Sequence, residues 1–163
     1  RGQEKTTTAS IVAKESDMDK SVHMHTDDFF HYLSKGAIPP HLPESNKQNL
    51  VVIEAFLEAA KRYARGGYDV IVDGIVGPWF LEPWKALAQE DYEVHYIVLE
   101  RVKKETMKRA VERSKLDRKT NIELVETMWE QFSGLGIYES NVIDTTTFTI
   151  KDTVSAIKEK SCM

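Results

Sequence analysis

Short apolar segments alternate with helical patterns along this chain, and that alternation most restricts its fold. The apolar segments, expected to be strands, cover residues 21–25, 68–72, 94–99 and 141–144. Helices are expected over residues 6–14, 46–65, 103–113, 122–132 and 151–160, with one turn over 28–33 and a loop and short helix over 78–89. Short apolar strands separated by helices are typical of a parallel sheet that is covered on both faces. We therefore predict a single α/β domain over residues 1–163.

Residues 46–65 form the clearest predicted helix. Val52 and Phe56 belong to an apolar set that recurs every three or four residues, which is the period of one helix face. Gly66 and Gly67 follow directly, and glycine is the usual residue at the end of a helix. We expect the helix to end there and the strand over 68–72 to begin at once.

Charged side chains follow several of the predicted strands. Asp27, Asp73 and Arg101 lie at or just past strand ends. In open sheets of parallel strands, ligands bind in the crevice outside the carboxyl ends of the strands. We therefore expect these three side chains to converge on one site.

The first residues of the chain partly match a phosphate-binding loop. The motif is G-x-x-x-x-G-K followed by Ser or Thr, in which backbone N–H groups and Lys hold phosphate and the hydroxyl binds magnesium. Lys5 and Thr6 match the end of the motif, and Thr7 follows them. However, Glu4 stands where glycine belongs, and only two residues separate Gly2 from Lys5, where the motif has five. An altered loop, a gap in the sequence and the plain start of a helix all remain open.

The aspartates after two strands suit phosphoryl transfer. Such a reaction needs a carboxylate that orients the acceptor hydroxyl or takes its proton. Asp27, the first residue with a carboxylate past its strand, is best placed for this, whereas Asp28 could cap the following turn. Asp73 could hold magnesium through water. The alternatives are that Asp27 and Asp28 are both caps, and that Asp73-Gly74 forms a turn.

Arg109 and Arg113 lie four residues apart on a predicted helix and therefore share one face. Two guanidinium groups on one face could clamp a phosphoryl group during its transfer. The alternative is a solvated face, on which Glu105 pairs with Arg109.

His23 and His25 lie two apart on a predicted strand and so point to the same side. That spacing can bind a metal, but no third ligand is evident nearby, and we do not favour a metal site. Trp79, Phe80 and Trp84 could wall an acceptor pocket by stacking on a ring or sugar. Packing in the core or in a lid explains these aromatic residues equally well.

Composition excludes several classes of function. A net charge of −4 and a pI of about 5.8 argue against a broad nucleic-acid-binding face, which needs clustered Lys and Arg. Cys162 is the sole cysteine, so no disulfide forms within the chain, and a reducing cytoplasm fits. We find neither a signal peptide nor a run of 18 apolar residues, so secretion and membrane spanning are not expected.

The order of these segments resembles the small P-loop kinases. The chain is similar in particular to the bacterial AAA-type ATPase/kinase-like proteins related to chloramphenicol phosphotransferase and gluconate kinase. The resemblance extends from Lys5 over nearly the whole chain. The segments that carry it are Lys5-Thr6, His-Thr-Asp-Asp-Phe-Phe at 25–30, Val-Ile-Val-Asp-Gly at 70–74, and Tyr-Ile-Val-Leu-Glu-Arg at 96–101 with the arginines after it.

This resemblance implies a three-layer α/β/α P-loop NTPase fold. Its five-stranded parallel sheet would have the order 2-3-1-4-5, and a mobile helical lid would cover about residues 101–121. The first strand, central in such a sheet, is not visible in the sequence. We therefore expect residues before Arg1 in the real protein, or residues lost from the sequence.

The resemblance also implies roles for individual residues. Lys5 would contact the outer phosphates of ATP, Asp27 would act as base, and Arg109 and Arg113 would be lid arginines. The ATP site is expected to include Gly2, Lys5, Thr6, Thr7 and Arg109, the acceptor site Asp27, Asp28, Phe29, Asp73 and Trp79, and the magnesium site Thr6 and Asp73.

We therefore expect an ATP- and Mg²⁺-dependent kinase that acts on a hydroxyl of a small molecule. The alternative is a nucleotide-binding protein without catalysis, which Glu4 in place of glycine supports. A kinase for nucleic-acid ends is less favoured because the chain has no basic stripe. The sequence leaves the acceptor and the oligomeric state open.

Overall fold

The computed structural model describes residues 2–74, 76, 81–100 and 140–161. In chain order, the elements are α1 (Gly2–Lys14), β1 (Ser21–His25), α2 (Thr26–His31), η1 (Pro43–Ser45), α3 (Asn46–Arg65), β2 (Asp69–Asp73), α4 (Glu82–Gln89), β3 (Val98–Glu100), β4 (Val142–Asp144) and α7 (Ile150–Ser161). The predicted helices over 103–113 and 122–132 and the predicted lid lie outside the described residues.

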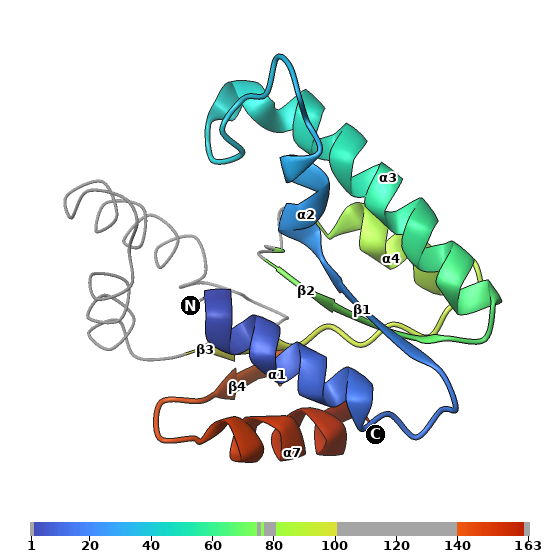
Figure 1. Cartoon of the computed structure of the whole chain (residues 1–163), viewed down its shortest axis with the longest axis vertical. Helices are drawn as coiled ribbons and strands as arrows, with labels where there is room; N and C mark the ends of the chain where they lie inside the picture. The colour runs from blue at the N-terminus through green and yellow to red at the C-terminus, as the bar shows by residue number, and fades with distance from the viewer. Residues whose placement is uncertain (1, 75, 77–80, 101–139, 162–163) are drawn as a thin grey trace.

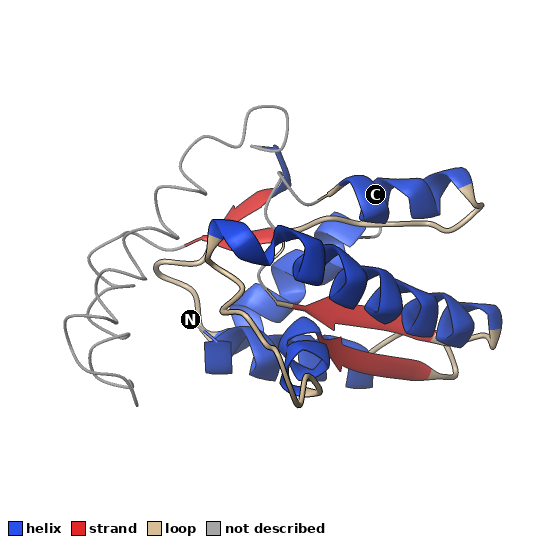
Figure 2. Cartoon of the chain, turned by 90° about the horizontal axis from the view of Figure 1, so that it is seen from above, coloured by secondary structure: helices blue, strands red, loops and turns tan. Residues whose placement is uncertain are grey.

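The predicted five-stranded sheet is wrong. The described strands form two separate two-stranded sheets, β1 with β2 and β3 with β4, which Figure 2 shows as separate pairs of arrows. Within the described part of the chain, no strand pairs with the other edge of β2 to join the two sheets. Both pairs are parallel, as the alternation of strands and helices predicts. The local pattern thus gives the direction of pairing but not the number of strands in one sheet.

The two faces of the β1–β2 sheet differ in character. Alternate side chains of a strand point to opposite faces. Val22, Met24, Val70 and Val72 pack in one apolar cluster with Phe56 of α3. The intervening positions carry His23 and His25 on β1 and Ile71 and Asp73 on β2, with His25 directly opposite Asp73. Polar side chains therefore gather on the face that is turned away from α3.

Helix α1 covers that polar face (Figure 1). Near its start, Thr6 contacts Asp73 at the end of β2. Just past its end, Ser16 contacts Asp69 at the beginning of β2. Helix α1 therefore runs antiparallel to β2, and its N-terminus lies at the carboxyl ends of the strands. On the far side of α1 lies α7, tied to it by an ion pair of 3.0 Å between Lys158 and Glu15.

The apolar core lies between the sheet and helices α3 and α4. Phe56 is fully buried, and its ring meets that of Phe29 edge-on, with centroids 5.0 Å apart. A second cluster joins Ile53 and Leu57 of α3 to Leu87 of α4. These residues follow the apolar period of α3, and the burial of each large side chain contributes on the order of 2 kcal/mol. The core therefore fixes α3 over one face of the sheet.

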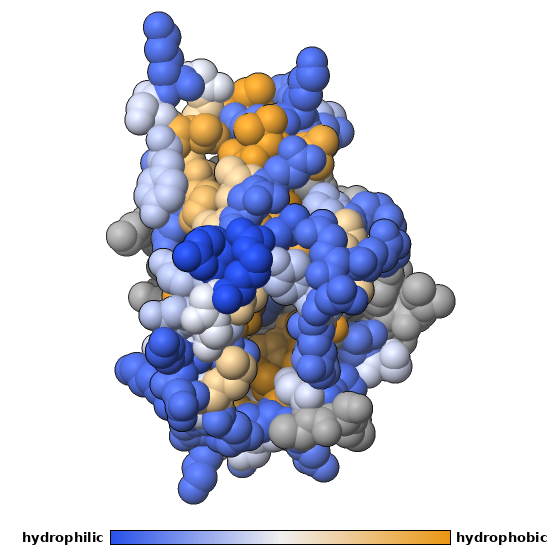
Figure 3. Space-filling model, turned by 90° about the vertical axis from the view of Figure 1, so that its right-hand side faces the viewer, coloured by the Kyte–Doolittle hydropathy of each residue, from blue (hydrophilic) through white to orange (hydrophobic). Residues whose placement is uncertain are grey.

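Most atoms on the face drawn in Figure 3 are hydrophilic, with apolar atoms gathered in places. Figure 3 shows apolar atoms gathered toward the upper end of the molecule, where α3 begins in Figure 1. Leu50 and Val51, near the start of α3, are among the exposed large apolar side chains.

The loop that precedes α3 is held against the helix by Gln48, whose side-chain amide forms two hydrogen bonds with the backbone of Ile38. The loop over residues 36–42 thus has a fixed anchor despite its prolines.

Helices α3 and α4 end in the same kind of turn. The N–H of Tyr68 bonds the carbonyl of Tyr63, and the N–H of Tyr92 bonds that of Leu87. In each turn the preceding residue is left-handed, Gly67 at φ 86° and Asp91 at φ 66°. A backbone hydrogen bond that closes a six-residue turn at the end of a helix is characteristic of the Schellman motif, in which the left-handed position favours glycine. Gly67 meets that preference and Asp91 does not.

Replacing Asp91 by glycine should stabilise the protein. The left-handed conformation costs an L-residue about 1–2 kcal/mol, and the greater freedom of glycine in the unfolded chain returns part of the gain. We expect Asp91→Gly to raise the free energy of unfolding in urea by up to about 1 kcal/mol. Gly67→Ala is the matched opposite change. A Cβ there meets nothing within 4 Å, so any loss comes from the backbone alone. A destabilised Asp91→Gly variant would contradict the assigned turn.

Candidate functional site

The carboxylate of Asp73 is the centre of the polar face. Its side chain is 7% exposed. Oδ2 accepts a hydrogen bond from the hydroxyl of Thr6 at 2.8 Å, and Oδ1 lies 2.7 Å from Nε2 of His23. A buried carboxylate is costly unless such partners satisfy it. The start of α1 and both strands therefore meet at one ionisable group.

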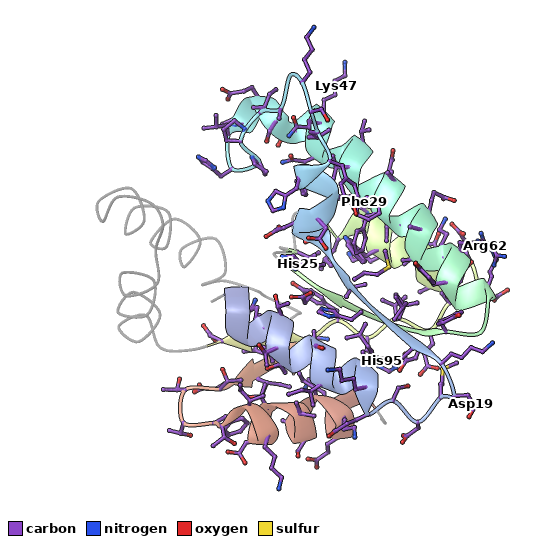
Figure 4. The ribbon with its side chains drawn as sticks, in the orientation of Figure 1. Asp19, His25, Phe29, Lys47, Arg62 and His95 are labelled. Atoms are coloured by element: carbon purple, nitrogen blue, oxygen red, sulfur yellow. The ribbon has the colours of Figure 1, made fainter. Side chains whose placement is uncertain are left out.

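His25 lies between two carboxylates. Its Nδ1 is 3.1 Å from Oδ1 of Asp73, and its Nε2 is 3.2 Å from Oδ2 of Asp27. Nδ1 is buried and, among the described residues, lacks an aligned hydrogen bond, so we treat its contact with Asp73 as electrostatic. The exposed fraction of the side chains rises from 7% at Asp73 through 24% at His25 to 51% at Asp27. The three groups thus lead from the interior to the surface, and Figure 4 labels the middle one, His25.

These contacts raise the pKa of His25 above its usual value of 6.5. Burial is the largest single influence and lowers this pKa, because it disfavours the charged ring. The negative charges of Asp73, Asp27 and Asp28, with the close contact to Asp73, act in the opposite direction. Together they outweigh burial, so the site favours the imidazolium.

A close approach fixes the two strand ends beside this cluster. Gly74 follows β2 at φ 152°, and Thr26 follows β1 with its side chain buried. A Cβ built on Gly74 would meet the hydroxyl of Thr26 and lie 2.9 Å from its Cβ. Glycine is therefore required there both by its backbone angle and by the space available. Gly74 thus allows the ends of β1 and β2 to lie close together, whatever the role of the Asp73 carboxylate.

The predicted phosphate-loop residues lie within α1. The helix already includes Gly2, so residues 2–5 are helical where the motif would have a loop. Lys5 is partly buried, Thr6 is at the site, and Thr7 is exposed. The structure thus brings Thr6 to Asp73, as the predicted magnesium pair requires, but not in a phosphate loop.

Asp27 and Asp28 are not helix caps. Helix α2 begins at Thr26, its N-cap position is His25, and no side chain makes a capping hydrogen bond there. Both aspartates lie in the first turn, where negative charge is favoured by the helix dipole, and both are exposed. The predicted base is therefore at the open end of the cluster, next to His25.

The aromatic candidates divide between the core and the undescribed segments. Phe29, a predicted acceptor contact, packs on Phe56 in the core (Figure 4). Trp84 also contacts Phe56, with ring centroids 5.9 Å apart, and belongs to the core rather than to a pocket wall. Five predicted site residues lie outside the described residues: Trp79, Phe80, Arg101, Arg109 and Arg113.

The donor set at Asp73 suits magnesium better than a transition metal. A hydroxyl and a carboxylate are oxygen ligands, which Mg²⁺ prefers, and protein sites often supply only one or two of its ligands. No group of three or more His, Cys, Asp or Glu side chains that could hold a metal is found within the described ranges. His23 and His25 point to the same side, as predicted, but both face Asp73. The spacing of the two histidines indicates only a possible metal site; the strand-end Asp73 is the signal for their other role.

Comparison with known proteins adds no family to this description. No protein-family model matches the sequence, and no curated protein matches it. Among the described residues, no helix is both long and apolar enough to cross a membrane. The site must therefore be interpreted from its own chemistry.

Protonation of His25 should stabilise the fold within a defined range of pH. Because its pKa is raised on folding, the stabilisation is complete below the usual value of 6.5 and is lost as the pH rises through the raised value. We expect the difference in free energy of unfolding between wild type and His25→Leu to be larger at about pH 5.5 than at about pH 8.5. Urea denaturation at both pH values measures this. A difference that grew with pH would mean that folding favours the neutral ring.

Proposed function

We propose that this protein is an ATP- and Mg²⁺-dependent phosphotransferase that acts on a hydroxyl group of a small molecule. The observation that carries the proposal is the hydrogen bond of 2.8 Å between Thr6 and Asp73. It places a hydroxyl from the first half of α1 together with a carboxylate, at the carboxyl ends of two parallel strands. Ligands of α/β proteins bind at such strand ends, and helix N-termini favour phosphate.

Each residue of the site has a proposed task. Thr6, together with Asp73 acting through water, would hold Mg²⁺, and Lys5 would contact the outer phosphates. When bound, ATP supplies the phosphoryl group, and Mg²⁺ offsets its charge. Asp27 would orient the acceptor hydroxyl and take its proton, a task that suits an exposed carboxylate at the open end of the cluster. Arg109 and Arg113 stay the predicted clamp on the transferring group. Such an enzyme would work in the cytoplasm, where ATP is supplied.

A second candidate is a nucleotide-binding protein without catalysis. Two observations favour it: residues 2–5 are helical rather than a loop, and Glu4 brings a negative charge to the segment that would face phosphate. This candidate predicts weak binding of nucleotide with little dependence on magnesium, so binding measurements distinguish it from the kinase.

Binding of ATP should depend on magnesium and on the hydroxyl of Thr6. We expect isothermal titration calorimetry to give micromolar binding of ATP with Mg²⁺ and much weaker binding without it. Thr6→Val removes the hydroxyl and should weaken binding in the presence of Mg²⁺ by about tenfold, equivalent to about 1.4 kcal/mol. Binding that is weak and equal with and without the metal would instead favour the non-catalytic candidate.

Asp27→Asn should abolish phosphoryl transfer and leave ATP binding nearly intact. Loss of a general base typically costs about 10²–10⁴-fold in rate, whereas Asp27 has no proposed contact with ATP. An acceptor is first found by screening hydroxylated small molecules with the wild type. The rate of ADP formation with that acceptor is then compared between the wild type and the variant. Asp28→Asn is the matched control, because it removes the same charge one residue further along and should alter the acceptor KM rather than turnover. Full activity of Asp27→Asn would remove Asp27 from the mechanism.

A further inference from the structure

Among the described residues, His25 alone forms an ion pair with Asp27. Its carboxylate is 51% exposed and lies 3.2 Å from Nε2 of His25. Within the described part of the chain, Asp27 makes no other ion pair and accepts no hydrogen bond. Without this ion pair, an exposed carboxylate near a helix start would exchange among the side-chain rotamers that the helical backbone allows. The orientation of Asp27 therefore depends on His25.

His25 itself is fixed from the interior. It is the last residue of β1, directly opposite Asp73 in the parallel register. Its Nδ1 lies 3.1 Å from Oδ1 of the buried Asp73, and His23 and Thr6 hold that same carboxylate in place. The ring thus lies between a fixed, buried carboxylate on one edge and an exposed carboxylate on the other.

We propose that His25 is a positioning residue that transmits the fixed geometry of Asp73 to the carboxylate of Asp27. The proposal rests on the proposed function, in which Asp27 acts on the acceptor hydroxyl. His25 touches neither ATP nor acceptor in this scheme. Its task is to keep Asp27 in one rotamer at the open end of the site. Such preorganisation matters because a misplacement of about 1 Å can cost about a hundredfold in rate.

The first test measures the rotamer of Asp27 directly. Three-bond couplings between Cγ of Asp27 and its backbone nitrogen and carbonyl carbon report χ1 by NMR. We expect one rotamer in the wild type and averaged couplings in His25→Leu. His23→Leu is the matched control, because it also removes a partner of Asp73 but no contact with Asp27. If His25→Leu does not fold, His25→Gln provides a polar replacement for the same measurement, with partial averaging expected.

The second test measures turnover with Mg·ATP and with water as acceptor. His25→Leu should lower kcat for ADP formation by roughly ten- to a hundredfold while KM for ATP stays within about twofold. His23→Leu should instead act on the magnesium requirement, because His23 contacts only Asp73 of the three groups. An unchanged kcat in a His25→Leu variant with averaged couplings would overturn the proposal.

The two tests separate failure of this inference from failure of the proposed function. A wild type that neither binds Mg·ATP nor forms ADP would refute the kinase, while the couplings would still decide whether His25 holds Asp27. A single Asp27 rotamer in His25→Leu, or equal averaging in His23→Leu, would refute the positioning role even in an active enzyme.

Discussion

The buried carboxylate of Asp73 is the constraint on which the described architecture depends. A charge in this position is tolerated only if its neighbours satisfy it, since an unpaired buried carboxylate costs several kcal/mol. Its partners come from different elements: Thr6 from α1, and His23 and His25 from β1. Helix α1 therefore cannot shift along the sheet without breaking the hydrogen bond from Thr6 to Oδ2 of this buried group. The same requirement that stabilises the layer also assembles the candidate site.

The sheet separates packing from chemistry by its two-residue alternation. Met24 and Val72 face α3 and contribute to the apolar core, while their neighbours His25 and Asp73 face α1. A shift of one residue in register would exchange these faces and bury charge against Phe56. The core thus holds the strands in the one register that brings His25 opposite Asp73. Stability and the geometry of the site are therefore set by the same pairing.

Local signals predict local features of this chain. The apolar period of α3 and the glycines after it give the helix as it is observed, Asn46–Arg65. The place of Asp73 at the site is predicted by its position at the end of a strand, and the local sequence, an apolar segment followed by Asp-Gly, is enough to locate that end. Parallel pairing of β1 with β2 also follows from the helices between them. Each of these features is determined by residues close together in sequence or by a strand–helix–strand connection, whose handedness is known.

Long-range features could not be predicted in this way. The number of strands in a sheet depends on pairing between distant segments, and the expected five-stranded sheet is not formed by the described residues. The family resemblance implies an acceptor-site role for Phe29, yet the ring contact with Phe56 of α3 places it in the core. The roles of His23 and His25 depend on Asp73, which lies fifty residues from His23 in sequence. Spacing within β1 showed that the two rings share a side but not what they face.

The contact between Gly74 and Thr26 has a consequence at the level of the gene. Any codon change that replaces glycine introduces a Cβ, and at position 74 that atom would collide with Thr26 where the two strands end. Truncating residue 26 to alanine would remove the colliding hydroxyl, but its Cβ would still lie 2.9 Å from the new atom, and the backbone angle of φ 152° at residue 74 would stay. A second-site change thus offers only partial compensation. Random mutagenesis would find few viable routes away from this pair, although neither residue carries a charge or touches a proposed ligand.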